Sequence, residues 1–394
     1  AETITALNAY IPTLEGYSDF VARGSETIKQ LNIIRQLGVD AFASVEGFAE
    51  KITSVNDKED DDPINDTLTK KIDVALGSTQ RLPMIEHFSS STCSYCVNVD
   101  NQMHTLIDNN VDKFTYVKYP LNFPAPGDPY NTAECQVRKD YYIVNAAPRV
   151  VLDGFNLGST AVSQYQLDNS YNEAAFVDIK GAFNVEGKTI NVTTDVMSYV
   201  NLENVKTFVS VNEKTTTGNV GNNGETEFHH IMMKMLPNHE GTTLNLTSSE
   251  LQHFEFSYDM NDTHMEELTD LEVAVWIQDY YDHTIYNSNY LYEYTEHPYT
   301  VQNLKLTDTD STLLITWEAP EKGIPIGYKV YVDGDLVAET DTETLTYVHN
   351  GNIITNDKAH IAEVVAIYDE IMTSVRVAKV IQKTWVDNIE ENTD

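Results

Sequence analysis

Hydrophobic and polar residues follow different patterns in successive parts of the chain, and each pattern predicts a different kind of unit. From residue 81 to residue 175, short apolar runs alternate with helical periodicity. This predicts strands at 82–88, 114–119 and 149–152 and helices near 97–109, 132–145 and 160–175. Alternating strands and helices are typical of α/β units. We therefore expect an α/β domain over residues 81–175, with the proline-rich insert 120–129 at its surface.

The following residues alternate apolar and polar side chains with the period of β-strands. This pattern covers 190–193, 206–211 and 272–277. Turns rich in Gly and Asn, such as Gly218–Gly224, separate these stretches. We expect a β-sandwich over 176–298 and a second, smaller sandwich over 299–383. Within the second sandwich, Asp333-Gly334 predicts a hairpin turn.

The two ends of the chain have weaker patterns. Apolar residues between 28 and 39 fit a helix about as well as a pair of strands around Gly38, and we favour a small β unit for residues 1–80. The tail 384–394 is acidic and poor in apolar residues, which is typical of a linker. The predicted fold class is therefore multidomain, α/β plus all-β.

Charge narrows the choice of partners. The chain has 61 acidic and 25 basic residues, giving a net charge of -36. Because such a field repels nucleic acids and anionic lipid surfaces, we expect no nucleic-acid partner. No apolar run reaches the roughly 18 residues that a membrane-spanning helix needs, so we expect no transmembrane segment.

The clearest candidate for chemistry is Ser90-Ser-Thr-Cys-Ser-Tyr-Cys96, which lies between a predicted strand and a predicted helix. A thiol at the start of a helix lies near unpaired amides, and the positive end of the helix dipole favours its thiolate. We expect Cys93 to be the nucleophile. Cys96, one turn further on, is close enough to resolve a mixed disulfide.

Metal binding is the other use of such a pair, because Cys-x-x-Cys is also half of a zinc site. His87, His104 or Cys135 could supply further ligands. His104 lies 8 residues beyond Cys96 (104 − 96), which is roughly 12 Å along a helix and too far from the thiolates. We therefore expect no metal and no cofactor. Cys135 fits a small buried hydrophobic residue on a helix, and a catalytic role for it stays open.

Phe88–Cys96, followed by Ala147-Pro148 and Asp153-Gly154, resembles a thioredoxin-fold domain. Over about residues 81–295 the chain is similar to the outer-membrane-protein-28-related thioredoxin-like proteins of Bacteroidetes. The stretches 229–237 and 276–279 contribute to this similarity. The resemblance implies that Pro148 is a cis-proline close to the two cysteines.

The resemblance also implies a buried proton relay six residues before Cys93. This chain has His87 at that position and Glu86 beside it, so both are candidates, and we favour His87 because histidine exchanges protons near neutral pH. The chain departs from thioredoxins at Thr92, where they usually have Trp, and at Ser94-Tyr95, where they have Gly-Pro. The direction of the redox reaction therefore stays open.

The last sandwich resembles fibronectin type III domains through Trp317 and Tyr328-Lys-Val-Tyr331, with His360 in place of their second conserved Tyr. Residues 386–392 resemble the linker that precedes the C-terminal sorting domain of proteins exported by the Bacteroidetes type IX route. This implies an extracellular or outer-membrane-associated location.

Two hypotheses for function follow. The first is thiol–disulfide exchange with protein thiols or disulfides through Cys93, Cys96, Pro148 and His87 or Glu86. The second is a non-enzymatic surface protein that binds cell-surface proteins or glycans and uses the thioredoxin fold as a scaffold. His229-His230 beside three Met residues could bind copper, and the tyrosines of 280–294 could bind sugars or peptides, but we favour core packing and half-exposed strand positions for these groups.

Overall fold

The structure is a computed structural model that describes residues 75–308, 312–350 and 360–381. It also describes the backbone of four short strands before them: β1 (Val45–Lys51), β2 (Ser54–Val55), β3 (Lys58–Glu59) and β4 (Thr67–Ile72). β1 pairs with β4 and β2 with β3, both antiparallel. The ambiguous segment 28–39 and the tail 384–394 lie outside the described residues.

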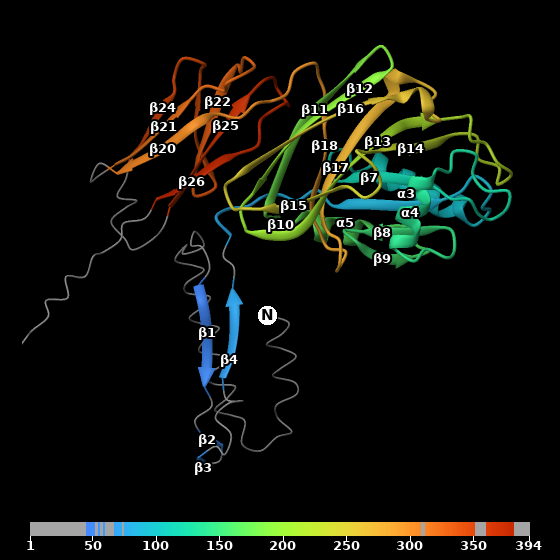
Figure 1. The fold of residues 1–394 in the computed structure, drawn as a ribbon, viewed down its shortest axis with the longest axis horizontal. Helices are drawn as coiled ribbons and strands as arrows, with labels where there is room; N and C mark the ends of the chain where they lie inside the picture. The colour runs from blue at the N-terminus through green and yellow to red at the C-terminus, as the bar shows by residue number, and fades with distance from the viewer. Residues whose placement is uncertain are drawn as a thin grey trace, which may run out of the picture.

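The α/β part contains a parallel strand pair with helices beside it (Figure 1). Its elements are β6 (Met84–Ser89), α3 (Cys96–Asp108), β7 (Thr115–Pro120), α4 (Ala133–Tyr141), β8 (Arg149–Leu152), β9 (Phe155–Gly158) and α5 (Gln164–Tyr171). β6 pairs parallel with β7 and antiparallel with β8, which pairs antiparallel with β9. Strands and helices thus alternate as the sequence predicts.

Two helices are shorter than predicted because local sequence signals set where α4 ends and where α5 begins. α4 stops at Tyr141, two residues before Ile143, which has a left-handed φ of 54°. α5 starts only at Gln164, because Ser163 and Gln166 form a capping box there.

The sheet does not end at the expected boundary between residues 175 and 176. β14 (Phe228–Leu236) pairs with β7, and β13 (Leu202–Thr216), β17 (Leu271–Asp279) and β18 (Ile285–Tyr290) follow in the same sheet, with β15 (Thr242–Leu246) on β13. The result is one nine-stranded sheet in which residues 81–175 and 176–298 share a layer. Alternation predicts these strands correctly but does not say which sheet a strand joins, which is why we expected two separate units.

A second sheet packs on this one. It contains β16 (Leu251–Asp259), β12 (Thr189–Ser198), β11 (Val177–Glu186) and β19 (Tyr292–Glu293) in that order. Short elements complete this part: β5 (Thr79–Gln80), β10 (Ala174–Ala175) and the 3-10 helices η3 (Met260–Asp262) and η4 (Leu268–Asp270).

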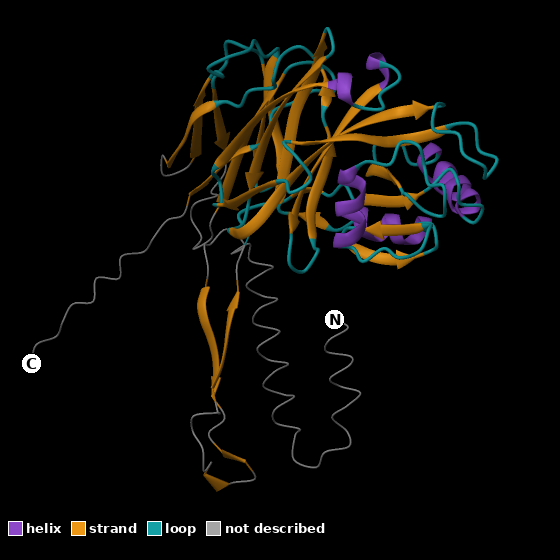
Figure 2. Cartoon of the chain, turned by 45° about the vertical axis from the view of Figure 1, so that its right-hand side comes forward, coloured by secondary structure: helices purple, strands orange, loops and turns teal. Residues whose placement is uncertain are grey.

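Separate hydrophobic clusters fill the two faces of the nine-stranded sheet. On one face, Phe88 and Trp276 share a cluster with Cys135 of α4. On the other face, Ile85 packs with Met103 of α3 and Leu167 of α5, and the second sheet covers the remaining strands. The α-helices α3, α4 and α5 therefore gather at one end of the molecule (Figure 2).

The third part is a β-sandwich of three strands against four. β20 (Gln302–Asp308), β21 (Thr312–Glu318) and β24 (Thr346–Asn350) form one sheet, and β23 (Asp335–Thr340), β22 (Gly327–Val332), β25 (His360–Ile367) and β26 (Val377–Ile381) form the other. Trp317 and Tyr328 meet edge to face in its core, with ring centroids 5.6 Å apart. Asp333-Gly334 forms the predicted hairpin turn, with φ of 52° and 88°. The sandwich is fibronectin type III-like, as the sequence indicates.

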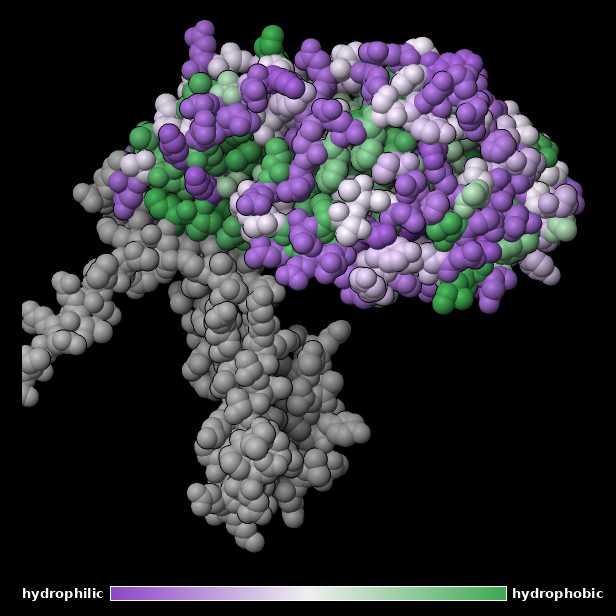
Figure 3. All heavy atoms as spheres, in the orientation of Figure 1, coloured by the Kyte–Doolittle hydropathy of each residue, from purple (hydrophilic) through white to green (hydrophobic). Residues whose placement is uncertain are grey.

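Hydrophilic residues cover most of the face of the molecule shown in Figure 3, in keeping with the large negative charge. Among the helices of the described residues, none has both the length and the apolar character needed to cross a membrane. Met232, Met233 and Met235 are buried in the clusters on the two faces of the sheet, where they fill the core.

Candidate functional site

Cys93 and Cys96 form a disulfide at the point where β6 passes into α3, with 5.3 Å between their Cα atoms. Cys96 is the first residue of α3, so its N–H is one of the amides that the helix leaves unpaired. This N–H donates a hydrogen bond to Sγ of Cys93 at 3.1 Å. The same contact would stabilise a thiolate on Cys93 after reduction, because an amide hydrogen bond favours the charged form of its acceptor.

Neighbouring segments fix the loop that carries the cysteines. From the proline-rich insert, the Asp128 carboxylate accepts the N–H of Ser91 at 2.9 Å, and the carbonyl of Pro124 accepts the hydroxyl of Thr92 at 2.7 Å. From the other side, the N–H of Asn223 donates to the carbonyl of Ser91 at 3.0 Å. The cysteine loop is therefore held between two other loops.

The loop between β13 and β14, residues 217–227, is here called the cover loop. Its Gly221 approaches the cysteine loop so closely that a Cβ atom there would lie 2.3 Å from the carbonyl oxygen of Ser91. Cys93 is only 3% exposed and Cys96 is fully buried, whereas Tyr95 between them is 83% exposed. The oxidised site thus presents Tyr95 to solvent and keeps both sulfur atoms shielded.

A buried charged cluster lies one helical turn beyond Cys96. The Asp100 carboxylate accepts the hydroxyl of Ser89 at 2.9 Å and forms an ion pair with Lys118 of β7 at 3.0 Å. Burial opposes ionisation of Asp100, but the charge of Lys118, together with His87 and the hydrogen bonds from Lys118 and Ser89, outweighs it and holds the pKa of this carboxyl below its usual value. Asp100 is therefore ionised, and it lies on the helix face that carries Cys96.

His87 belongs to the same cluster. Its Nδ1 lies 2.6 Å from the Tyr116 hydroxyl and 3.5 Å from the Asp100 carboxylate. Burial lowers the pKa of His87 to about 4, so its imidazole is neutral at pH 7. Burial also disfavours the charged form of Glu225, a residue of the cover loop, and so raises its pKa. The negative charge of nearby Asp100 raises this pKa further. The cover loop thus contributes a carboxyl group to the cluster beneath the disulfide.

Glu86 lies on the opposite face of the sheet, because successive residues of a strand point to opposite sides. Arg138 of α4 donates to its carboxylate at 2.6 and 3.0 Å, and the hydroxyls of Tyr119 and Tyr142 donate at 3.0 and 2.5 Å. The structure therefore brings His87, and not Glu86, to the side of α3 and the cysteines. Glu86 is part of a buried ion pair that joins α4 to the sheet.

Pro148 and Cys135 complete the predicted set. The Ala147–Pro148 bond is cis, and Pro148 directly precedes Arg149, which pairs with Phe88 at the end of β6 that leads to the cysteines. Cys135 is fully buried in α4, on the Glu86 face, and burial raises the pKa of its thiol to about 12. Cys135 therefore does not share the site of Cys93 and Cys96.

Asp100 and Lys118 are the residues that sequence reasoning missed. A signal for Asp100 is present, because it follows Cys96 by four positions on the buried helix stripe that also contains Val99 and Met103. A carboxylate on such a stripe requires a buried cation, and Lys118 lies within the apolar strand pattern of β7.

No family model matches this chain, and no curated protein does. Among solved structures, HBP35 of Porphyromonas gingivalis is 14% identical, with a TM-score of 0.43 over 78% of this chain and 100% of that chain. A protein from Agrobacterium tumefaciens is 13% identical, with a TM-score of 0.40 over 56% and 98%. An Fn3-like protein from Clostridium thermocellum is 14% identical, with a TM-score of 0.19 over 23% and 97%. Similarities at this level do not assign a function to the chain.

The reactivity of the three thiols should differ sharply after reduction. We expect iodoacetamide to modify Cys93 well before Cys135 between pH 6 and pH 9. With a pKa of about 12, Cys135 has roughly a thousandth of the thiolate of an ordinary thiol near 8.5. Peptide mapping by mass spectrometry at successive times gives the two rates, and the urea-unfolded chain, in which both react alike, is the control. Equal rates in the folded protein would contradict the proposed activation of Cys93.

Loss of the Glu86 carboxylate should destabilise the fold. Glu86→Ala leaves Arg138 buried without its counter-ion, so we expect the free energy of unfolding to fall by about 3–5 kcal/mol. Urea denaturation followed by tryptophan fluorescence measures this change. Glu173→Ala, at an exposed carboxylate, should change it by less than about 0.5 kcal/mol. A similar small loss in both variants would show that the ion pair is not a main contributor to stability.

Proposed function

We propose that this protein is a thioredoxin-like thiol–disulfide exchange protein that acts on other proteins through Cys93 and Cys96. The observation that carries the proposal is the disulfide at the start of α3, with the Cys96 amide donating to Sγ of Cys93 and an ionised Asp100 one turn below. The strand–helix arrangement of β6 to α5 and the cis Pro148 at the same end of the sheet agree with such a site.

The exchange takes two steps. In the reduced protein, the Cys93 thiolate attacks a sulfur of the partner's disulfide, forms a mixed disulfide and releases one partner thiolate. The Cys96 thiol then loses its proton and attacks Cys93, which releases the second partner thiolate and restores the Cys93–Cys96 disulfide. Run in reverse, the same steps transfer a disulfide from Cys93–Cys96 to a partner dithiol.

Asp100 is the proton acceptor we assign to the second step. It is ionised, it follows Cys96 by one turn, and Lys118 neutralises its charge in the buried state. Neutral His87 lies against the same carboxylate through Nδ1, so it is the neighbouring group with which Asp100 can share this proton.

A partner would first contact Tyr95, since this is the large exposed side chain between the cysteines. An aromatic ring at that place offers apolar contact area to an unfolded or extended peptide. Both sulfur atoms become accessible only if the cover loop moves away from Ser91. We infer that the protein is secreted or held at a cell surface, which the resemblance of residues 386–392 supports.

The alternative is a non-enzymatic surface protein in which this unit is a scaffold. The burial of both cysteines favours it, since a static disulfide needs no access. The fibronectin type III-like sandwich would suit either function.

Exchange can be tested with insulin as a defined disulfide substrate. We expect the full chain to accelerate the reduction of insulin by dithiothreitol, measured by turbidity, and Cys93→Ser to abolish the effect. Cys96→Ser should instead accumulate a mixed disulfide between Cys93 and an insulin chain, because the resolving thiol is absent. Cys135→Ser is the matched control and should behave as the wild type. The scaffold hypothesis predicts no acceleration by any of the four proteins.

Gly221 allows a test of the cover loop. Gly221→Ala places a methyl group against the Ser91 carbonyl, so the loop must open. We expect Tris(2-carboxyethyl)phosphine to reduce the Cys93–Cys96 disulfide roughly tenfold faster, which corresponds to ~1.4 kcal/mol lost from the closed state. Asn222→Ala, at an exposed position of the same loop, is the control. If both variants are reduced at the wild-type rate, the cover loop does not limit access.

A further inference from the structure

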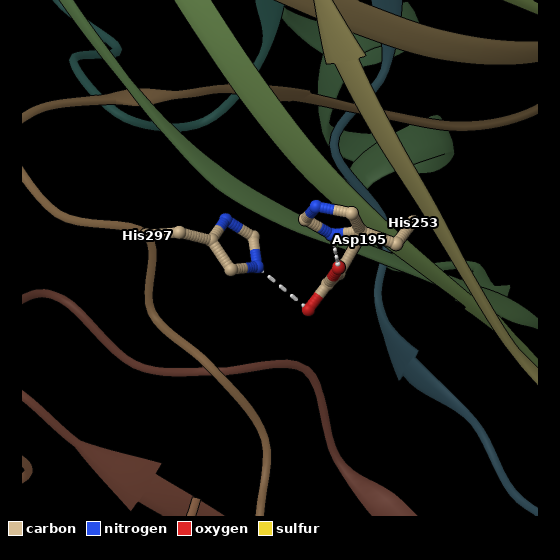
Figure 4. A group of neighbouring side chains, drawn as sticks. All are labelled: Asp195, His253 and His297. Atoms are coloured by element: carbon tan, nitrogen blue, oxygen red, sulfur yellow. Dashed lines mark hydrogen bonds and ion pairs between the residues drawn. The ribbon is translucent and has the colours of Figure 1, made fainter. Parts of the chain in front are cut away.

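A second cluster of metal-ligating side chains lies far along the chain from the cysteines, where the second sheet meets the segment that leads to the last sandwich. Asp195 of β12 and His253 of β16 are direct partners across these two strands. His297 comes from the connector between β19 and β20, residues 294–301. Figure 4 shows both imidazole rings turned towards the one carboxylate between them. This site is independent of the proposed function.

The three side chains already stand at nearly the separations that a shared ion needs. Nδ1 of His253 lies 2.6 Å from Oδ1 of Asp195, and Nε2 of His297 lies 2.8 Å from Oδ2. One ligand atom of each residue lies within 4.8 Å of the other two. Zinc bonds of about 2.0–2.2 Å place tetrahedral ligands roughly 3.3 Å apart. To admit the ion, each imidazole nitrogen would move away from the carboxylate oxygen that it contacts by roughly 0.5–0.7 Å.

The outer ring nitrogens have partners of the kind that orient metal ligands. Nε2 of His253 lies 3.2 Å from the carboxylate of Glu255, and Nδ1 of His297 lies 3.0 Å from the hydroxyl of Thr193. Because an ionised carboxylate only accepts hydrogen bonds, both ring nitrogens of His253 donate here, and a metal ion at Nδ1 would take the place of the proton that faces Asp195. Metal-bound histidines usually have such a second partner.

Burial adds to the case. The side chains of Asp195 and His297 are only 2% and 1% exposed, and His253 closes the site at the surface with 33%. A buried carboxylate needs compensating positive charge, which a divalent ion would supply. A cavity of about 480 Å³, lined by His297, Thr193, Tyr299 and Lys322 among others, lies beside the cluster.

We propose that Asp195, His253 and His297 bind a divalent transition-metal ion, with Zn²⁺ as the first choice. Two imidazole nitrogens and one carboxylate oxygen suit zinc and related ions better than Ca²⁺ or Mg²⁺, which prefer oxygen ligands. Three protein ligands leave one position for water or for a small ligand in the neighbouring cavity. The ion would also tie the connector to β12 and β16, and so fix the start of the last sandwich relative to the second sheet.

The proposal can be tested by titrating the full, oxidised chain with ZnCl2 after treatment with a chelator and desalting. The oxidised protein is used because the disulfide prevents Cys93 and Cys96 from binding the ion. Isothermal calorimetry should show one equivalent of Zn²⁺ bound, and Co²⁺ should give the visible absorption of a four-coordinate site. His253→Gln and His297→Gln should each weaken binding about 100-fold or more, and Thr193→Val about 10-fold, as expected for an outer partner.

His229→Gln is the matched control, since His229 pairs with His104 elsewhere in the molecule, and it should bind zinc as the wild type does. Circular dichroism of each variant checks that it is folded. Zinc should also raise the melting temperature of the wild type and of His229→Gln, but not that of His297→Gln. Two results would overturn the proposal: no stoichiometric binding by the wild type, which leaves a purely hydrogen-bonded cluster, or unchanged binding in folded His253→Gln and His297→Gln.

Discussion

Strand β6 is the element on which the site depends, because it is buried on both faces and both edges. It pairs with β7 on one side and β8 on the other, and all six of its residues are buried. Because successive side chains of β6 point to opposite faces of the sheet, each polar side chain of this strand is buried in the core on one face or in the core on the other. His87 joins α3 and the charged cluster near the disulfide, whereas Glu86 joins Arg138 under α4. A shift of one residue in β6 would exchange these environments and place the arginine partner beside the cysteines.

The extension of the sheet beyond β7 has a direct consequence for the cysteines. The loop between β13 and β14 reaches the segment that follows β6, where the N–H of Asn223 donates a hydrogen bond to the carbonyl of Ser91. The cover loop reaches the cysteine loop because Gly221 has no side chain at the point of closest approach. Residues more than 120 positions apart in sequence thus shield one disulfide, and its chemistry depends on the β part as well as on the α/β part.

The sequence predicts the local elements well, because strand alternation, helix periodicity and turn residues are local signals. β8 lies at its predicted bounds, α3 differs by about one residue at each end, and Asp333-Gly334 forms the expected turn. The joining of 81–175 and 176–298 in one sheet is not visible in the pattern, because a strand buried on both faces looks the same in any sheet. The cysteine pair is apparent from its spacing. Asp100 has only the weak signal of a carboxylate on a buried helix stripe, and Lys118 and the triad of Asp195, His253 and His297 meet their partners only through tertiary contacts.

The two buried polar clusters differ in what balances their charge, and this difference bears on their chemistry. At the disulfide, Lys118 already neutralises Asp100, so the carboxylate can exchange a proton with a neighbour without an added ion. At the other cluster, no Lys or Arg side chain forms an ion pair with Asp195 within the described residues, and two imidazoles face it instead. Imidazoles balance a carboxylate only when they hold extra protons or share a cation. The charge of Asp100 in the first cluster is therefore balanced within the protein, whereas the second cluster reaches full charge balance by taking up protons or a metal ion.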